Sequence, residues 1–136
     1  MKLVLDTNAV SALMKGDPVF IEKLRQQNKE DVNIPQPVLA EIAYGIERLP
    51  NSRKKQTLQE RFELVKAELA RSSWSDEVSE AFGRIKATLE KRGQRIEDFD
   101  AAIAAHALAS EAVLVTANID HMTRIPGLKV EDWSTP

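Results

Sequence analysis

Two short apolar segments, each followed by polar residues, limit the fold of this chain more than any other feature. Leu3–Leu5 is followed by Asp6–Asn8, and Val113–Val115 is followed by Thr116–Asn118. Apolar runs of this length fit buried strands better than helices. The stretch between them is far too long for a hairpin and shows helical periodicity. We therefore expect the strands to pair in parallel through right-handed crossovers.

The remaining sequence predicts further strands and a series of helices. Val32 and Ile34 alternate with polar residues before two prolines, as in a short strand that turns into a helix. Residues 101–109 are alanine-rich and apolar on most sides, as in a buried helix, and residues 128–130 indicate one more strand. Four other segments carry apolar stripes at helical spacing: Phe20, Ile21 and Leu24 after a start at Asp17-Pro18; Leu39, Ile42, Ala43 and Ile46; Leu58, Phe62, Val65 and Leu69; and Val78, Phe82, Ile85 and Leu89 between a cap at Ser75 and a stop at Gly93.

This order of elements predicts a single α/β domain over residues 1–136, with an open, mostly parallel twisted sheet and helices on both faces. A chain of 136 residues that is 43% hydrophobic suits one core of this kind. There is no cysteine and there are two histidines, which excludes disulfides, thiolate metal sites and a histidine-rich zinc site. Any metal is therefore expected to be held mainly by oxygen.

The first residues and the net charge limit the location and partners of the chain. We expect neither a signal peptide nor a membrane segment at the N-terminus, because Asp6 follows only three apolar residues. The expected location is the cytoplasm. A net charge of −2 argues against binding nucleic acid through a broad basic field, but it leaves room for a local basic patch.

Several acidic residues from separate segments could meet at one edge of the sheet. Asp6 and the segment 116–120 follow strands, at the edge where open α/β sheets bind ligands. Glu41 lies off the apolar stripe of its helix, and Asp100 lies at the start of the alanine-rich helix. Carboxylates brought together repel each other unless protons or a hard cation such as Mg²⁺ or Mn²⁺ neutralise them. A metal held in this way can support phosphodiester hydrolysis.

Four segments in this order and spacing resemble PIN-domain proteins, in particular the VapC toxins of bacterial toxin–antitoxin pairs. They are LVLDTN at 3–8, AEIAYG at 40–45, DAAIAAHA at 100–107 and LVTAN at 114–118. The resemblance implies a Mg²⁺- or Mn²⁺-dependent endoribonuclease, usually a homodimer, that is held inactive by an antitoxin whose C-terminal segment wraps the toxin. It places Asp6, Glu41 and Asp100 at the three acidic positions of the family.

The fourth position of the family's acidic site differs in this chain. Asn118 stands where many relatives carry an acid, which weakens the case for a second tightly held metal. Asp120 could compensate, directly or through water. Thr116 is either a plain strand-end residue or a hydroxyl that orients a carboxylate or a metal-bound water. We predict one well-held Mg²⁺ anchored by Asp6 and Asp100, with any second ion arriving with RNA.

Structural roles compete with several of these assignments. Asp6 could cap the helix that follows the first strand, although Thr7 or Asn8 could serve there instead. Glu41 could be a solvated charge. Of the two acids at the start of the alanine-rich helix, we expect Asp98 to be the cap and Asp100 the ligand.

Three aromatic residues are expected to be structural. We expect His106 to be a hydrogen-bonded, partly buried residue rather than a catalyst. Trp74 and Trp133 are expected to fill the core or an interface rather than to stack on bases.

Basic residues concentrate at Arg53-Lys54-Lys55 and in the set Lys86, Lys91, Arg92 and Arg95. Such runs are usually solvated faces, but an acidic site that cuts RNA needs flanking cations for the phosphates. We prefer Lys91, Arg92 and Arg95 as RNA contacts because they precede Asp100 closely.

The sequence also suggests walls for an antitoxin groove and allows an alternative to catalysis. For the antitoxin groove, the helices around Phe20 and over 39–49 are candidate walls. The alternative function is a PIN-like module that binds nucleic acid or a partner with little turnover.

Overall fold

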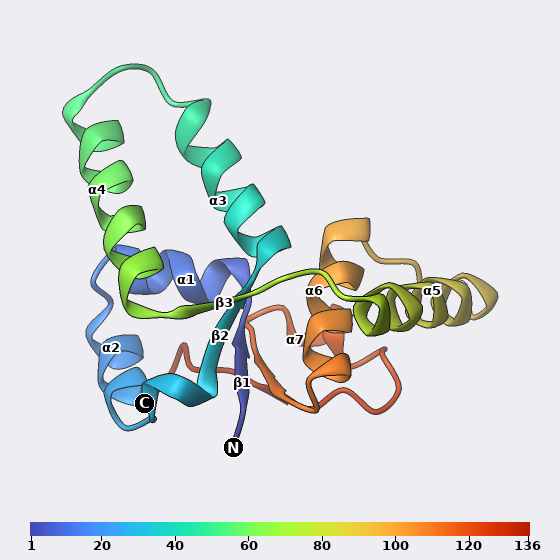
Figure 1. Ribbon diagram of the computed structural model, residues 1–136. Helices are drawn as coiled ribbons and strands as arrows, with labels where there is room; N and C mark the ends of the chain where they lie inside the picture. Colours follow the sequence, from blue (N-terminus) through green and yellow to red (C-terminus); the bar gives the residue numbers. More distant parts are fainter.

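Five parallel strands form one sheet in the order β3-β2-β1-β4-β5 in the computed structural model, which describes residues 1–136 (Figure 1). Every pair of neighbouring strands is parallel, and Leu3 lies opposite Val32 on one side and Val113 on the other. The predicted parallel sheet is therefore confirmed. The strands are β1 (Leu3–Leu5), β2 (Val32–Pro35), β3 (Ala70–Ser72), β4 (Val113–Val115) and β5 (Val130–Glu131).

Seven α-helices and one short 3-10 helix connect the strands. Figure 1 shows α1, α2 and α4 on one side of the sheet and α5 and α6 on the other, so helices cover both faces as the sequence predicts; α3 rises above the end of β2. The bounds are α1 (Thr7–Met14), α2 (Pro18–Arg25), η1 (Lys29–Asp31), α3 (Gln36–Glu47), α4 (Arg53–Glu68), α5 (Asp76–Lys91), α6 (Asp98–Ala109) and α7 (Ile119–Met122). No helix is both long and apolar enough to cross a membrane.

Local capping explains where several helices begin. The Asp17 carboxylate accepts hydrogen bonds from two backbone N–H groups in the first turn of α2, and the Ser75 hydroxyl accepts one in the first turn of α5. Gly93 follows α5 with a φ of 65°, which suits glycine and ends the helix. These predicted boundaries are confirmed. The predicted cap at Asp98 is wrong: residue 97 occupies that position, and the Asp98 carboxylate lies 3.1 Å from Lys86 Nζ.

One cluster of 32 buried residues forms the core, and it includes all of β1 and β4. Residues 101–107 of α6 are all buried, because alanine lets this helix pack closely against α5 and the sheet. The predicted stripe of α3 is wrong at Ala43, which is exposed. The other three predicted positions, Leu39, Ile42 and Ile46, are buried as predicted, and Val38 is buried in place of Ala43.

Two strands depart from the sequence-based expectation. The segment Ala70–Ser72 forms edge strand β3, although it has no apolar run and two of its residues are exposed. The last strand begins at Val130, two residues later than expected. Both are edge strands, where pairing with a single neighbour demands little apolar surface.

The connectivity creates a switch point between β1 and β4. The chain runs from β1 outward to β2 and β3, and then crosses to the other side of β1 to form β4 and β5. In open α/β sheets, ligands bind in the crevice at the carboxyl ends of the strands where the strand order reverses. Asp6 follows β1 and Thr116 follows β4, so both lie at this crevice.

Candidate active site

Asp6 is held rigidly at the carboxyl end of β1. Its side chain is 3% exposed, and its backbone N–H donates to the carbonyl of Val115 at 2.9 Å. One carboxylate oxygen accepts the Thr7 N–H at 2.7 Å, and the other accepts the Thr116 hydroxyl at 2.6 Å and the Asn8 amide at 3.3 Å. Asp6 is also the N-cap of α1, so it fills the structural role that the sequence left open for it. The cap role and a site role coexist, because a carboxylate has lone pairs for both.

The Thr116 hydroxyl is buried beside Asp6 and hydrogen-bonded on both sides. It is 1% exposed, donates to Asp6 and accepts the backbone N–H of Asn118 at 2.9 Å. Asn118 begins α7 without a side-chain capping bond, and it is partly exposed. Asp120 is exposed.

Glu41 reaches the site from α3. Its Oε1 accepts the hydroxyl of Thr7 at 2.5 Å, which connects α3 to the first turn of α1. Thr7 therefore contacts two acids, Asp6 through its backbone N–H and Glu41 through its side chain. The prediction that Glu41 lies off the apolar stripe of its helix is confirmed, because the side chain is partly exposed.

Asp100 completes the acidic group from the first turn of α6. Burial, and after it the charges of Asp6 and Glu41, together raise the pKa of Asp100 from 3.8 to about 6. His121 acts in the opposite direction. Asp100 thus lies close enough to Asp6 and Glu41 to be repelled by the charge of each.

Three neighbours of these acids were missed as site residues in the sequence. Thr7 donates a hydrogen bond from its hydroxyl to Glu41. His121, on α7, lies near enough to Asp100 for its charge to lower the pKa of that carboxyl. Asn8 donates to Asp6 and accepts the N–H of Ala117 at 3.0 Å, so it ties the end of β1 to the end of β4. Thr7 and Asn8 directly follow Asp6, but the sequence analysis treated them only as possible caps.

The donor set matches a hard divalent cation, since all three acids offer carboxylate oxygens. As the side chains lie, no three His, Asp or Glu groups are arranged to hold one ion. Glu41 in particular is engaged with Thr7. A metal would therefore require side-chain rotation to complete its ligands.

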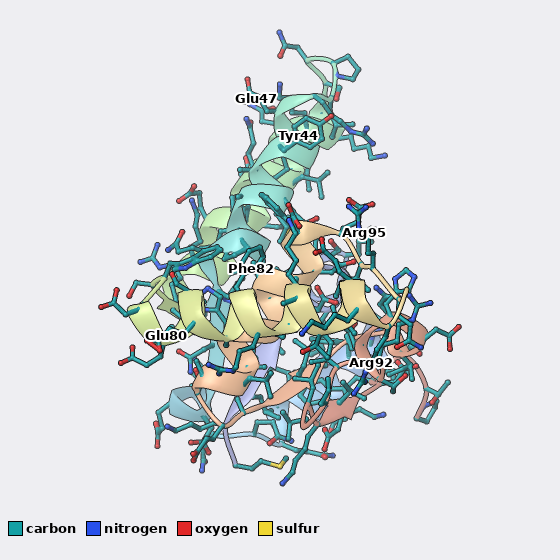
Figure 2. The ribbon with its side chains drawn as sticks, turned by 90° about the vertical axis from the view of Figure 1, so that its right-hand side faces the viewer. Tyr44, Glu47, Glu80, Phe82, Arg92 and Arg95 are labelled. Carbon is teal, nitrogen blue, oxygen red and sulfur yellow. The ribbon has the colours of Figure 1, made fainter.

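The predicted RNA contacts lie at one end of α5. Lys91, Arg92 and Arg95 are exposed, and Figure 2 shows Arg92 and Arg95 at the C-terminal end of this helix. No hydrogen bond or ion pair joins them to the three acids. Arg124 donates weakly to the carbonyl of Arg95 at 3.4 Å, which links α7's C-terminal side to this loop.

The remaining aromatic candidates have structural roles. Trp133 is buried against Phe20 with ring centroids 5.2 Å apart, as expected for a core residue. Trp74 is 46% exposed and covers His106 edge-on at 5.8 Å. His106 is 1% exposed, more deeply buried than expected, and its Nε2 has no hydrogen-bond partner, contrary to the sequence-based expectation. Burial lowers the pKa of His106.

Comparison with known proteins gives a consistent result along the chain. The PIN domain family model matches residues 3–128. Ribonuclease VapC2 of Rickettsia felis is 34% identical over 135 residues, which cover 98% of each chain. The tRNA(fMet)-specific endonuclease VapC of Salmonella typhimurium is 29% identical over 133 residues, again 98% of each chain.

Solved structures agree with the sequence comparison. The chain matches a chain of the structure of VapBC2 from Rickettsia felis bound to a DNA fragment from their promoter, with a TM-score of 0.88 and 31% identity over 98% of this chain and 100% of that one. The DNA-bound VapBC structure from Salmonella typhimurium gives a TM-score of 0.87 at 29% identity, with 98% of each chain covered. FitAcB from Neisseria gonorrhoeae, at 23% identity and a TM-score of 0.81, shares the fold.

Proposed function

The chain belongs to the PIN-domain family, and from this premise we propose that it is a toxin-type endoribonuclease that hydrolyses RNA phosphodiester bonds and is inhibited by a cognate antitoxin. The observation that carries the proposal is the crowding of Asp100 with Asp6 and Glu41 at the switch point of the sheet. Such crowding is unfavourable unless a cation neutralises it, and it is typical of sites that act on phosphate esters.

Each residue of the site has a distinct role in this proposal. Asp6, Glu41 and Asp100 would hold one Mg²⁺, for which Mn²⁺ could substitute. When bound, the ion would polarise the scissile phosphate, make a bound water more acidic and neutralise developing charge. Thr116 and Asn8 orient Asp6 by donating to its carboxylate, so that it does not need to reorganise during the reaction.

The fourth position adds a neutral group. Asn118 offers an amide oxygen rather than a charge, which suits one well-held ion with a second arriving with RNA. Asp120 is exposed at the start of α7 and could contribute through water.

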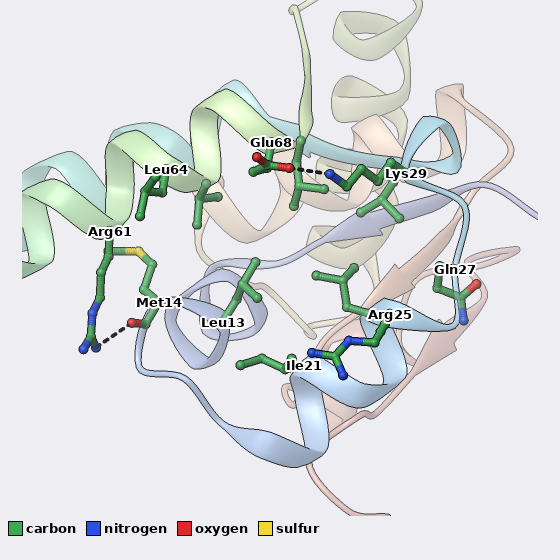
Figure 3. A pocket seen from close by; sticks show the side chains of 13 residues that line it. Leu13, Met14, Ile21, Arg25, Gln27, Lys29, Arg61, Leu64 and Glu68 are labelled. Atoms are coloured by element: carbon green, nitrogen blue, oxygen red, sulfur yellow. Dashed lines mark hydrogen bonds and ion pairs between the residues drawn. The ribbon is translucent and has the colours of Figure 1, made fainter.

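An apolar groove supports the antitoxin as a partner. It has a volume of about 490 Å³, and the side chains of α1, α2 and α4 surround it (Figure 3). Leu64 is 64% exposed at its rim, as expected for a surface that a partner covers. The predicted wall around α2 is supported by Ile21 and Leu24, which line the groove, whereas no residue of α3 lines it. The titles of the similar structures describe VapBC pairs, which also favours such a partner.

The proposal also covers the oligomeric state of the chain and its place in the cell. We propose a homodimer in the cytoplasm, supported by the family resemblance and by three exposed aromatic side chains, Tyr44, Trp74 and Phe99, that lie outside the groove. Figure 2 shows Tyr44 on α3, above α5 in this view. Light scattering after size-exclusion chromatography should give twice the mass of the chain, and a monomer would refute the dimer alone.

A cleavage assay tests the catalytic proposal. The purified chain, free of antitoxin, is incubated with structured RNAs, including tRNA, plus Mg²⁺ or Mn²⁺. We expect cleavage by the wild type, a loss of about 100-fold or more in Asp6→Asn and Asp100→Asn, and no loss in the matched control Asp98→Asn. Equal cleavage by all four proteins would show that the activity is a contaminant. Binding of RNA without any cleavage would favour the alternative function, a binding module.

A further inference from the structure

A second basic surface lies at the far end of α1 from the acidic site. Lys15, just after α1, and three cations of α4 line an open cavity of about 490 Å³. Its lining contains no acidic residue, and none of the four cations takes part in an ion pair. All four cationic residues are exposed. The complete lining is Lys15, Arg53, Lys54, Thr57, Leu58 and Arg61.

Local structure does not explain why these cations gather. Arg53 and Lys54 lie in the first turn of α4, where the helix dipole favours acidic side chains and disfavours basic ones. No acid in that turn offsets them. Arg61 is fixed in place because its guanidinium donates to the carbonyl of Met14 at 2.9 Å (Figure 3). Four positive charges around one cavity therefore attract an anion from outside the chain.

The other basic concentration of the chain is already partly neutralised. The small cavity beside α5 that contains Lys86 and Arg95 is also lined by Glu90 and Asp98. Lys86 Nζ lies 3.1 Å from the Asp98 carboxylate. The cavity at α4 thus offers the stronger uncompensated positive charge.

The position of the cavity relates it to the acidic site. Thr7, Ser11 and Lys15 follow one another at four-residue intervals along one face of α1, and none of them is buried. Thr7 contacts Glu41, and Lys15 lines the cavity. An eight-residue helix is about 12 Å long, at about 1.5 Å per residue. One RNA strand can span this distance within a few nucleotides, so it can contact both sites.

We propose that Lys15, Arg53, Lys54 and Arg61 form a phosphate-binding site that holds the RNA backbone a few nucleotides from the bond that is cut. This inference rests on the proposed function, because it takes RNA as the substrate. The chemistry of the lining favours phosphate over a partner peptide: Leu58 is the single apolar residue of the cavity, whereas the neighbouring groove is mainly apolar. Contacts of this kind position the strand without reading its sequence.

Binding measurements at several salt concentrations test the site. A labelled 20-nucleotide single-stranded RNA is titrated in EDTA with the Asp100→Asn protein, which prevents cleavage. In that background, Arg53→Gln/Lys54→Gln should weaken binding about 10-fold at 0.1 M salt. The slope of log K against log salt should become shallower by about 1.4, at about 0.7 per lost phosphate contact.

A matched double variant controls for net charge. Arg84→Gln/Lys129→Gln removes two exposed cations that line none of the cavities described here, and it should change affinity and slope much less. Equal effects of the two double variants on affinity and slope would overturn the proposal. Unchanged RNA binding, together with weakened binding of a 20-residue polyglutamate peptide by Arg53→Gln/Lys54→Gln, would overturn it in favour of an acidic peptide partner.

Cleavage kinetics separate this inference from the proposed function. With the active-site acids intact, Arg53→Gln/Lys54→Gln should raise KM for a 20-nucleotide RNA and leave kcat unchanged. A dinucleotide RNA has no phosphate other than the one that is cut, so it cannot use the cavity and should be cut equally by wild type and variant. If no RNA is cut by any protein but the loss of binding is observed, the proposed function fails and the phosphate site stands.

Discussion

Replacing Asp100 by asparagine should make the metal-free protein more stable at neutral pH while abolishing its activity. The Asp100 carboxylate is partly buried and faces the charges of Asp6 and Glu41. Asparagine keeps the shape of the side chain but carries no charge. The substitution therefore removes a repulsion that the folded state tolerates for its function.

The size of this effect follows from the pKa of Asp100. A rise from 3.8 to about 6 corresponds to about 3 kcal/mol, at about 1.36 kcal/mol per pKa unit. Because the side chain is only partly buried, solvent screens part of this energy, and we expect a gain of about 1 to 2 kcal/mol. In a chain of this size, a gain of about 1 kcal/mol raises Tm by about 3 to 5 °C.

The destabilisation caused by the Asp100 charge should increase as the pH rises. The folded state binds the Asp100 proton more tightly than the unfolded state, because the folded pKa is the higher one. The wild-type penalty is therefore absent below pH 3.8, grows as the pH rises through about 6 and is complete above it. The difference between wild type and Asp100→Asn should follow the same course.

Urea unfolding followed by circular dichroism in EDTA at pH 4, 6 and 8 measures this difference. Asp98→Asn is the matched control, since its exposed ion pair with Lys86 should contribute less than about 1 kcal/mol. Adding Mg²⁺ should stabilise the wild type but not Asp100→Asn. A destabilised Asp100→Asn protein, or a difference that does not change with pH, would refute the reasoning.

Three further predictions concern the neighbours of the site and the core. Thr116→Val should destabilise the protein by about 1 to 3 kcal/mol in urea unfolding and lower cleavage activity, because Asp6 loses a buried donor; Thr116→Ser should restore both, and a fully active valine variant would argue against the orienting role. Because the pKa of His106 is lowered, wild-type stability should fall as the pH drops below 6.5, and His106→Phe should remove that part of the decline; an identical pH profile in the variant would contradict this. Asn118→Asp should raise the number of Mn²⁺ ions bound per chain from one to two in calorimetry, and unchanged stoichiometry would show that a fourth acid is not what limits the second ion.

Much of the fold follows from local patterns in the sequence. Strands β1 and β4 are continuous apolar runs, and α5 repeats its apolar residues at helical spacing behind a serine cap, so each could be located before the structure was known. Strand β3 could not, because its Ala-Arg-Ser segment gains its place from pairing with β2 rather than from its own side chains. Ala43 was misplaced because Val38 and Ala43 both fit the helical spacing of Leu39, Ile42 and Ile46, and the pattern does not show which edge of the stripe is buried.

Part of the candidate site could also be predicted from sequence segments. Asp6, Glu41 and Asp100 stand in segments that resemble a known family, and the structure brings them together. The contacts of Thr7 with Glu41 and of Asn8 with Ala117 join residues 34 and 109 positions apart. Such contacts depend on how α1 packs against α3 and β4, which no local pattern encodes.

We propose that carboxylates from three separate elements hold one divalent cation, and a direct measurement of metal binding tests this most strictly. Mn²⁺ is titrated into the purified chain, and free Mn²⁺ is measured by electron paramagnetic resonance. We predict one tightly bound Mn²⁺ per chain, lost in Asp6→Asn and in Asp100→Asn but retained in Asp98→Asn. Binding that is unchanged in Asp6→Asn and Asp100→Asn, or absent from the wild type, would contradict the account.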